Sequence, residues 1–241
     1  MRLERSEMNT HVQEFSVQDR YCGPKGMVNG GWISGLLASY LPSAGAVEVT
    51  LRAPTPVDAG LRIERAGSRV ELFHGTELLV EAVPAEEDPL PPPFVPLDQA
   101  RRAERHFVGA GSHPFPDCFV CGEREPGNGM RIHPGTVGAP GTVAASWFAH
   151  PVLAEWAASM PLTHVWGALD CPSGWAHLEP GGVALLGRIT ARVHRQVVPG
   201  RTYVVVARRQ GRERRKLFAS SAVYEVDGRL VAAAGATWIE M

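Results

Sequence analysis

The sequence predicts an α+β protein built from one unit used twice: a strand, a buried helix and an antiparallel meander. In the first half, residues 29–41 place large apolar side chains at helical spacing, with small side chains opposite. Four strand candidates follow each predicted helix, separated by Pro, Gly and short turns. The spacing also repeats, since Phe15 and Trp147 each lie 14 residues before the start of a helix. We interpret this pattern as an old internal duplication.

Length and composition limit the classes of protein. At 241 residues the chain is long enough for one large domain or for two of about 120 residues. Hydrophobic residues make up 44% and charged residues 20%, which is typical of a globular protein. A formal net charge of -1 gives no general attraction to nucleic acid or anionic lipid, so we expect neither as a partner.

No targeting or membrane segment is expected. The start, M-R-L-E-R-S-E, is charged, and no stretch reaches the roughly 18 apolar residues that a membrane helix needs. Four cysteines do not make a disulfide framework in a chain of this size. A reducing cytoplasm is therefore the expected location.

The elements of the first half are bounded by residues that start or stop regular structure. Alternation within 11–20, carried by Val12, Phe15 and Val17, predicts the first strand. Asn29 is a good N-cap for the helix, and Pro42 ends it because proline cannot continue the hydrogen-bond ladder. The meander strands are predicted at 47–52, 61–66, 68–73 and 77–83.

Composition changes after Pro84, where E-E-D-P-L-P-P-P-F-V-P cannot form regular structure. We predict an N-terminal domain at 1–84, a proline-rich linker at 85–117 with one short exposed helix near 98–105, and a C-terminal domain at 118–241. Proline runs are also ligands for partner proteins, and the sequence leaves this alternative open.

The second half repeats the plan of the first. A predicted strand at 142–148 precedes a helix that starts near Pro161, a residue that suits the first helical position. The strands that follow are predicted at 182–193, 201–208, 216–226 and 229–239.

Two features of the predicted helices point to chemistry. Gly30 and Gly31 expose backbone N–H groups at the first helix N-terminus, where a negatively charged oxygen can bind, although two glycines can also simply end a loop. Asp170 lies beside the apolar stripe of the second helix, where burying a carboxylate is unfavourable unless it is used or paired. It is either a base or nucleophile with a raised pKa, or a cap for backbone that Pro172 disturbs.

Three segments together resemble the hotdog-fold thioesterase superfamily: V-N-G-G at 28–31, A-L-D-C-P at 168–172, and F-P-D-C-F-V-C-G-E-R-E-P-G-N-G-M-R-I-H-P-G at 115–135. Many members of the phenylacetyl-CoA and 4-hydroxybenzoyl-CoA thioesterase type carry H-G-G at the helix N-terminus and an acidic residue about nine positions later. The resemblance implies a double hotdog, with two antiparallel sheets each wrapping a central helix, as an intramolecular pseudo-dimer.

Each half lacks what the other half has. Asn29, Gly30 and Gly31 take the H-G-G places, but the residue nine positions after Asn29 is Ala38, which is not an acid. Asp170 supplies an acid, but the second helix has no glycines nine residues earlier. Hotdog dimers pair the glycine end of one helix with the acid of the partner. The resemblance therefore implies one composite site, in which Gly31 N–H, with Gly30, polarises a thioester carbonyl while Asp170 activates water or attacks.

Further substrate contacts are expected from Ser34, Thr163 and His164, which lie on the two helices. His164 can hydrogen-bond a substrate, or it can be a satisfied core or surface residue. Arg131 is a candidate for the phosphates of coenzyme A.

Other basic residues compete with Arg131 for that contact. They are Arg192, Arg195 and the run R-R-Q-G-R-E-R-R-K at 208–216. The run is expected to be a hairpin tip, and such a tip is also a common way to keep a sheet edge from aggregating.

The cysteines leave a metal site open. Cys118 and Cys121 form a single C-x-x-C, and zinc would need two more ligands. The histidines within range are His106, His113 and His133. The resemblance implies instead a metal-free loop and no cofactor. Cys171 is expected to be a small packed residue, because nothing near it in the sequence supplies a base.

The expected function is hydrolysis of an acyl-CoA or a related acyl thioester at a site between the halves. One alternative is a non-catalytic acyl or acyl-CoA binding protein of the same fold. The other is a hydratase or dehydratase, although the sequence has no Asp and His paired in the arrangement that those enzymes use. Assembly into a homodimer through the outer strands stays open.

Overall fold

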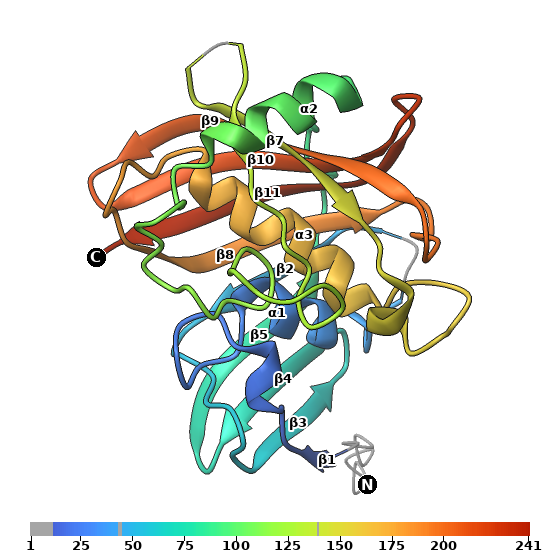
Figure 1. Ribbon diagram of the computed structural model, residues 1–241. Helices are drawn as coiled ribbons and strands as arrows, with labels where there is room; N and C mark the ends of the chain where they lie inside the picture. The colour runs from blue at the N-terminus through green and yellow to red at the C-terminus, as the bar shows by residue number, and fades with distance from the viewer. Residues whose placement is uncertain (1–11, 43–44, 139) are drawn as a thin grey trace, which may run out of the picture.

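The computed structural model of the protein describes residues 12–42, 45–138 and 140–241. Within these ranges, one antiparallel sheet of 11 strands curves around two helices that pack against each other (Figure 1). The predicted α+β class is confirmed. The prediction of two separate sheets is wrong, because hydrogen bonds join the strands of both halves into one sheet.

The first half contains one strand, one helix and a four-stranded meander. These elements are β1 (Val12–Phe15), α1 (Gly30–Ala38), β2 (Val47–Leu51), β3 (Leu61–Ala66), β4 (Arg69–His74) and β5 (Glu77–Pro84). The side chain of Asn29 accepts a hydrogen bond from the Trp32 N–H at 2.9 Å, so it caps α1 as the sequence predicts. Helix α1 ends at Ala38, three residues before the predicted end at Leu41.

A short helix and a two-residue strand precede the repeated unit in the second half of the chain. The elements are α2 (Leu97–Ala103), β6 (Gly135–Thr136), β7 (Thr142–Phe148), α3 (Leu162–Trp175), β8 (Ala184–Val193), β9 (Thr202–Glu213), β10 (Lys216–Glu225) and β11 (Leu230–Glu240). Most of the basic run 208–216 belongs to β9, so the hairpin tip is shorter than predicted.

Helix α3 continues through Pro172 instead of ending there. Hydroxyl groups satisfy backbone carbonyls next to this proline: Ser173 Oγ donates to the Asp170 carbonyl, and Ser221 Oγ donates to the Leu169 carbonyl, both at 2.6 Å. Neighbouring hydroxyls therefore donate to two backbone carbonyls near Asp170, and the Asp170 carboxylate makes its hydrogen bond elsewhere, to the Gly31 N–H.

The two halves share one strand order. The sheet runs β1-β3-β4-β5-β2 through the first half and then β8-β11-β10-β9-β7-β6 through the second. Apart from β6, the second sequence is the first one reversed, with each strand replaced by its counterpart. Strands β2 and β8 join the halves by antiparallel pairing from Val47 opposite Ala191 to Thr50 opposite Arg188.

Helices α1 and α3 approach closely because glycines face the contact. A Cβ on Gly35 would lie 2.7 Å from Thr163 Cα, and a Cβ on Gly31 would lie 2.4 Å from Asp170 Cβ. At Gly31 and Gly35 the small side of α1 does not face a strand. At these two glycines the neighbour is the other helix instead, which brings the α1 N-terminus beside Asp170.

The segment before and within α2 covers the outer face of the second half (Figure 1). Alternate residues of β9 point to opposite sides, so Val205 packs in the main core while Val204 and Val206 pack with Val95 and Ala100. The helix predicted as exposed is thus partly buried. Its apolar positions form a second, smaller core on the outer face of the sheet.

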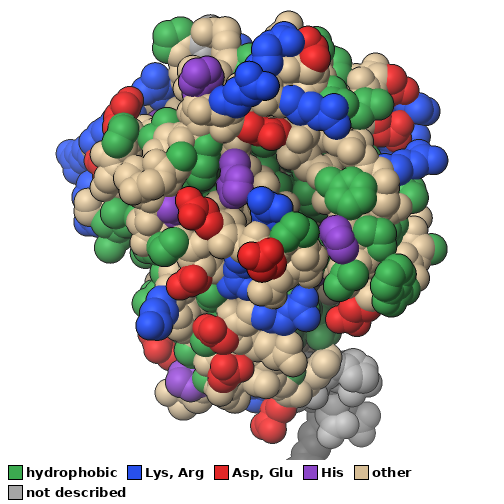
Figure 2. All heavy atoms as spheres, viewed as in Figure 1, with side chains coloured by type: hydrophobic (Ala, Val, Ile, Leu, Met, Phe, Trp, Pro, Cys, Tyr) green, Lys and Arg blue, Asp and Glu red, His purple; other side chains and the backbone are tan. Residues whose placement is uncertain are grey.

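The surface carries both signs of charge. Acidic and basic side chains are intermingled over the face drawn in Figure 2, in keeping with the net charge of -1. None of the helices in the described ranges combines the length and hydropathy that a membrane crossing requires.

Candidate functional site

A cavity of about 260 Å³ lies where the two halves meet. The first half contributes the start of α1 and the loop after β2, and the second half contributes the end of α3 and parts of β8 and β11. A loop between the halves, which includes residues 113–115, 118 and 121, forms a further wall. The lining is mainly apolar, and its polar side chains include Asn29, Arg52, His113 and Asp170.

Asp170 from the second half meets the N-terminus of α1 from the first half. Its Oδ2 accepts a hydrogen bond from the Gly31 N–H at 2.8 Å. Asp170 is 1% exposed, and every residue of α3 from His164 to Trp175 is buried. Because Gly31 has no side chain, the carboxylate can reach this amide. The structure thus brings together the acid and the glycine that the sequence placed in different halves.

Two effects change the pKa of the Asp170 carboxyl in opposite directions. Burial raises the pKa of the Asp170 carboxyl to about 7, while the hydrogen bond from Gly31 acts to lower it. Within the described residues, Oδ1 has no hydrogen-bond partner, although Oδ2 is held by Gly31. Asp170 therefore lines the cavity with one oxygen fixed by Gly31 and a second, buried oxygen that has no partner within the described residues.

Asn29 and Gly30 lie at the same end of α1. Asn29 is 3% exposed; its Oδ1 caps Trp32, and its Nδ2 donates to the sulfurs of Cys171 at 3.5 Å and Cys118 at 3.8 Å. Gly30 lines the cavity, and its N–H donates to no other group of the described ranges. Since Asp170 occupies the Gly31 N–H, Gly30 is the amide that remains for a ligand.

The other predicted contact residues on the helices do not line the cavity. Ser34 Oγ donates to the Gly30 carbonyl at 2.7 Å, within α1. Thr163 Oγ1 lies 3.0 Å from His164 Nδ1. The His164 ring is buried against Phe119, with ring centroids 5.0 Å apart.

The predicted basic residues also lie outside the cavity lining. Arg131 and Arg195 are exposed, and Arg192 pairs with Asp88. In the hairpin after β9, Arg215 Nε donates to the Glu240 carbonyl at 2.8 Å. The hairpin is therefore tied to β11 close to where that strand lines the cavity.

Sequence reasoning missed Arg52 and His113 as cavity residues. Arg52 follows β2 directly, its side chain is 50% exposed, and it pairs with Glu81. Its position as the last residue of the predicted strand 47–52 gives no sign that the strand ends at a cavity. His113 was considered only as a metal ligand, because its place in the predicted linker 85–117 gives no sign that it lies at the cavity.

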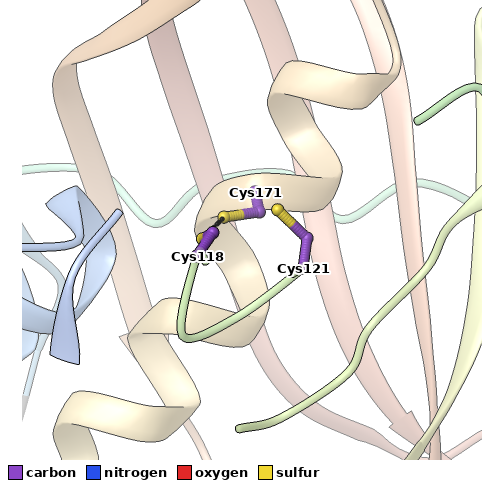
Figure 3. A group of neighbouring side chains, drawn as sticks. All are labelled: Cys118, Cys121 and Cys171. Atoms are coloured by element: carbon purple, nitrogen blue, oxygen red, sulfur yellow. Dashed lines mark hydrogen bonds between the residues drawn. The ribbon is translucent and has the colours of Figure 1, made fainter. Parts of the chain in front are cut away.

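Three cysteines line the same cavity. Their side chains lie next to one another (Figure 3). The sulfurs of Cys118 and Cys171 are 3.7 Å apart, and those of Cys118, Cys121 and Cys171 all lie within 4.8 Å of one another. His113 Nε2 lies 3.2 Å from Cys121 Sγ. Cys171 thus packs as the sequence predicts, but it packs against the C-x-x-C loop.

Comparison with known proteins gives matches among solved structures alone. No family model and no curated protein matches the sequence. A protein of unknown function with a hot dog fold from Alicyclobacillus acidocaldarius aligns with a TM-score of 0.61 at 14% identity, covering 95% of this chain and 93% of its own.

Two further solved structures have similar scores and different descriptions. A candidate oleoyl thioesterase from Lactobacillus plantarum aligns with a TM-score of 0.59 at 10% identity over 98% of both chains. The dehydratase domain of a mycocerosic acid synthase-like PKS aligns with a TM-score of 0.60 at 12% identity, over 97% of this chain and 92% of its own. Identities this low establish the shared architecture alone. The resemblance seen in the sequence is confirmed at that level, and this chain is a hotdog-fold protein.

Proposed function

We propose that the protein hydrolyses an acyl thioester in the cavity between its two halves. The observation that carries this proposal is the Asp170 carboxylate of the second half, held by the Gly31 N–H of the first half at the cavity wall. We further propose that the halves form a pseudo-dimer derived from a duplicated hotdog unit, which the shared strand order supports.

Asp170 acts as the base or as the nucleophile. Its Oδ2 is fixed by Gly31, which leaves Oδ1 to accept a proton from water or to attack the carbonyl carbon. In the water route, hydroxyl adds to the thioester carbonyl, the C–S bond breaks, and the proton taken by Asp170 passes to the departing sulfur. The products are a carboxylic acid and a free thiol.

Gly30 supplies the carbonyl contact in this scheme. Its N–H is at the N-terminus of α1, where the helix dipole favours the negative charge that develops on the carbonyl oxygen. Gly31 orients Asp170 instead of polarising the substrate, because one N–H cannot serve both oxygens well.

The lining of the rest of the cavity supports an acyl-CoA as the substrate. Its mainly apolar lining suits an acyl chain, and Arg52 beside it suits the phosphates of coenzyme A. This makes Arg52 a better candidate for the phosphate contact than Arg131, which lies outside the lining.

A dehydratase is the second candidate, because His113 and Asp170 line one cavity. However, both nitrogens of His113 are engaged: Nδ1 accepts from the Phe115 N–H at 2.9 Å, and Nε2 faces Cys121 Sγ. A histidine used in this way is poorly placed to move substrate protons, so hydrolysis is the better fit.

Thiol release from a panel of acyl-CoA esters of increasing chain length tests the proposal. Asp170→Asn keeps the size of the side chain and an acceptor for Gly31, and we expect it to lower kcat by about 100-fold or more. Asp227→Asn changes an exposed aspartate in the β10–β11 turn and is the matched control. Full turnover by Asp170→Asn would remove Asp170 from the mechanism.

The other functions give different results in the same panel. Saturable binding of acyl-CoA without turnover of any ester would favour the binding protein. Loss of absorbance from a 2-enoyl-CoA without thiol release would favour hydration, the reverse of dehydration.

A further inference from the structure

Three cysteines from distant parts of the chain meet in one buried cluster. Cys118 and Cys121 come from the loop between the halves, and Cys171 comes from α3, next to Asp170 (Figure 3). They are 3%, 4% and 7% exposed. The three sulfurs all lie within 4.8 Å of one another, close enough to bind one metal ion together.

We infer that Cys118, Cys121 and Cys171 form a binding site for a soft divalent metal ion, with zinc the first choice. Zinc–thiolate bonds of about 2.3 Å at tetrahedral angles separate two sulfurs by about 3.8 Å. The observed distance between Cys118 and Cys171 is 3.7 Å. The C-x-x-C spacing supplies two ligands from one turn of the loop, as in many zinc sites.

Buried N–H donors aimed at the sulfurs support metal binding over simple packing. Asn29 Nδ2 donates to both Cys118 and Cys171, although buried amides normally pair with oxygen acceptors. A thiol is a weak acceptor, whereas a thiolate carries a full negative charge and accepts strongly. Three packed thiols would not need such donors. Three metal-bound thiolates would.

His113 belongs to the outer shell of this site. Its Nδ1 accepts from the Phe115 N–H, so the proton of the neutral ring is on Nε2, which faces Cys121 Sγ at 3.2 Å. In this tautomer Nε2 donates to the sulfur and has no lone pair for a metal. The three sulfurs are therefore the protein ligands, and His113 compensates their charge.

Three protein ligands leave a fourth position on a tetrahedral ion. All three cysteines line the cavity, so water or a heteroatom of a bound molecule is the fourth ligand. Each thiol releases its proton to solvent when the metal binds, which gives a centre with one net negative charge. The Asn29 amide at the N-terminus of α1 favours that charge, whereas the Asp170 carboxylate, whose Oδ2 lies 3.9 Å from Cys171 Sγ, opposes it when ionised.

Metal content of the purified, reduced full-length chain tests the inference without any activity assay, so it stands or falls separately from the hydrolase proposal. After expression with added zinc and removal of loosely bound ions, we expect one zinc ion per chain. Cys171→Ser should abolish this retention. Cys22→Ser is the matched control, because Cys22 is also buried near this loop but lies outside the cluster.

Substituting His113 should weaken zinc binding less than substituting a cysteine of the cluster. His113→Ala should weaken zinc binding by about 10- to 100-fold, the effect of removing an outer-shell partner, while Cys118→Ser should weaken it far more. Equal losses from both substitutions would make His113 a direct ligand and overturn the three-sulfur site.

Cobalt titration of the unmutated protein keeps the test valid if the cysteine variants do not fold. A thiolate-to-cobalt charge-transfer band, together with protection of three of the four thiols from a thiol reagent, supports the site. Absence of both zinc and this band overturns it. A Cys118–Cys171 disulfide that forms in air, in a chain that binds no metal when reduced, also overturns it in favour of a redox pair.

Discussion

The Gly31 N–H lies 2.8 Å from Asp170 Oδ2, although 139 residues separate the two in the chain. This contact joins the halves at the point where their helices cross. It also explains the asymmetry of the motifs, since one helix supplies a bare N-terminus and the other supplies the acid. The contact requires a residue without a Cβ at position 31, and this requirement can be tested by substitution.

Gly31→Ala should destabilise the protein by about 1–3 kcal/mol, the usual range for overpacking a core. The new Cβ would lie 2.4 Å from Asp170 Cβ and 2.7 Å from the Trp166 carbonyl, so the helices must move apart. Urea unfolding measures the change in the free energy of unfolding. Gly235→Ala is the control, because its Cβ meets nothing within 4 Å. Equal stability of the two variants would mean that α1 and α3 do not cross as closely as described.

His164 should make the protein less stable as the pH falls below neutral. Burial, together with the smaller effect of the nearby Arg20 charge, lowers the pKa of His164 to about 4. The folded state thus holds fewer protons at this site than the unfolded state, in which the pKa is near 6.5. Stability from the neutral ring is complete above that value and is lost as the pH falls towards 4.

The size of this effect between pH 7 and pH 5 is about 2 kcal/mol. His164→Phe keeps an aromatic ring against Phe119 and removes the titration, so its free energy of unfolding should fall less over the same interval. The exposed His74 provides the control, and His74→Phe should follow the unmutated protein. Parallel pH profiles for all three proteins would contradict the prediction.

The local pattern of the sequence predicted most elements well. Strands β3 and β7 match the predicted ranges 61–66 and 142–148, because alternating side chains and flanking turn residues specify them locally. The joining of β2 to β8 could not be predicted. That pairing depends on which two strand edges meet after both halves have folded, and either strand alone shows no preference for its partner.

The candidate site was also predicted only in part, because only some of its residues carry a signal that is local in the sequence. Asp170 and Gly31 carry local signals, an acid on an apolar helix and a glycine at a helix start. Cys171 shows no such signal, because its partners Cys118 and Cys121 reach it only through the folded loop. The sequence therefore indicated an incomplete C-x-x-C, and the missing ligand was on the helix next to the acid.

Arg52 should affect the binding of acyl-CoA more than its turnover. Arg52→Gln removes a half-exposed positive charge from the cavity lining, and the KM for acyl-CoA should rise by about 5- to 10-fold with little change in kcat. An acyl-N-acetylcysteamine, which has no phosphates, should show no such difference. Arg131→Gln is the control, because Arg131 lies outside the lining. The same KM increase for both substrates would exclude a phosphate contact.

The segment that precedes α2 should loosen when its hydrogen bond to β10 is removed. The Tyr224 O–H donates to the Pro92 carbonyl, and the Tyr224 ring packs against Phe94 with centroids 5.4 Å apart. Tyr224→Phe keeps the ring and leaves the buried Pro92 carbonyl without its donor, which should lower the free energy of unfolding by about 1–2 kcal/mol. Because the lost contact is local, trypsin should also cleave faster at the arginines of α2.

Tyr40→Phe separates this effect from the general loss of a tyrosine hydroxyl. Tyr40 O–H donates to Gln13 Oε1 at 2.6 Å in an exposed position, where water replaces the lost partner. Its removal should change the free energy of unfolding by about 0.5 kcal/mol or less and leave cleavage in α2 unchanged. If both variants lose the same stability and cleave at the same rate as the unmutated protein, the segment is not held on the sheet by Tyr224. The outer face would then depend on the apolar contacts of Val95 and Ala100 alone.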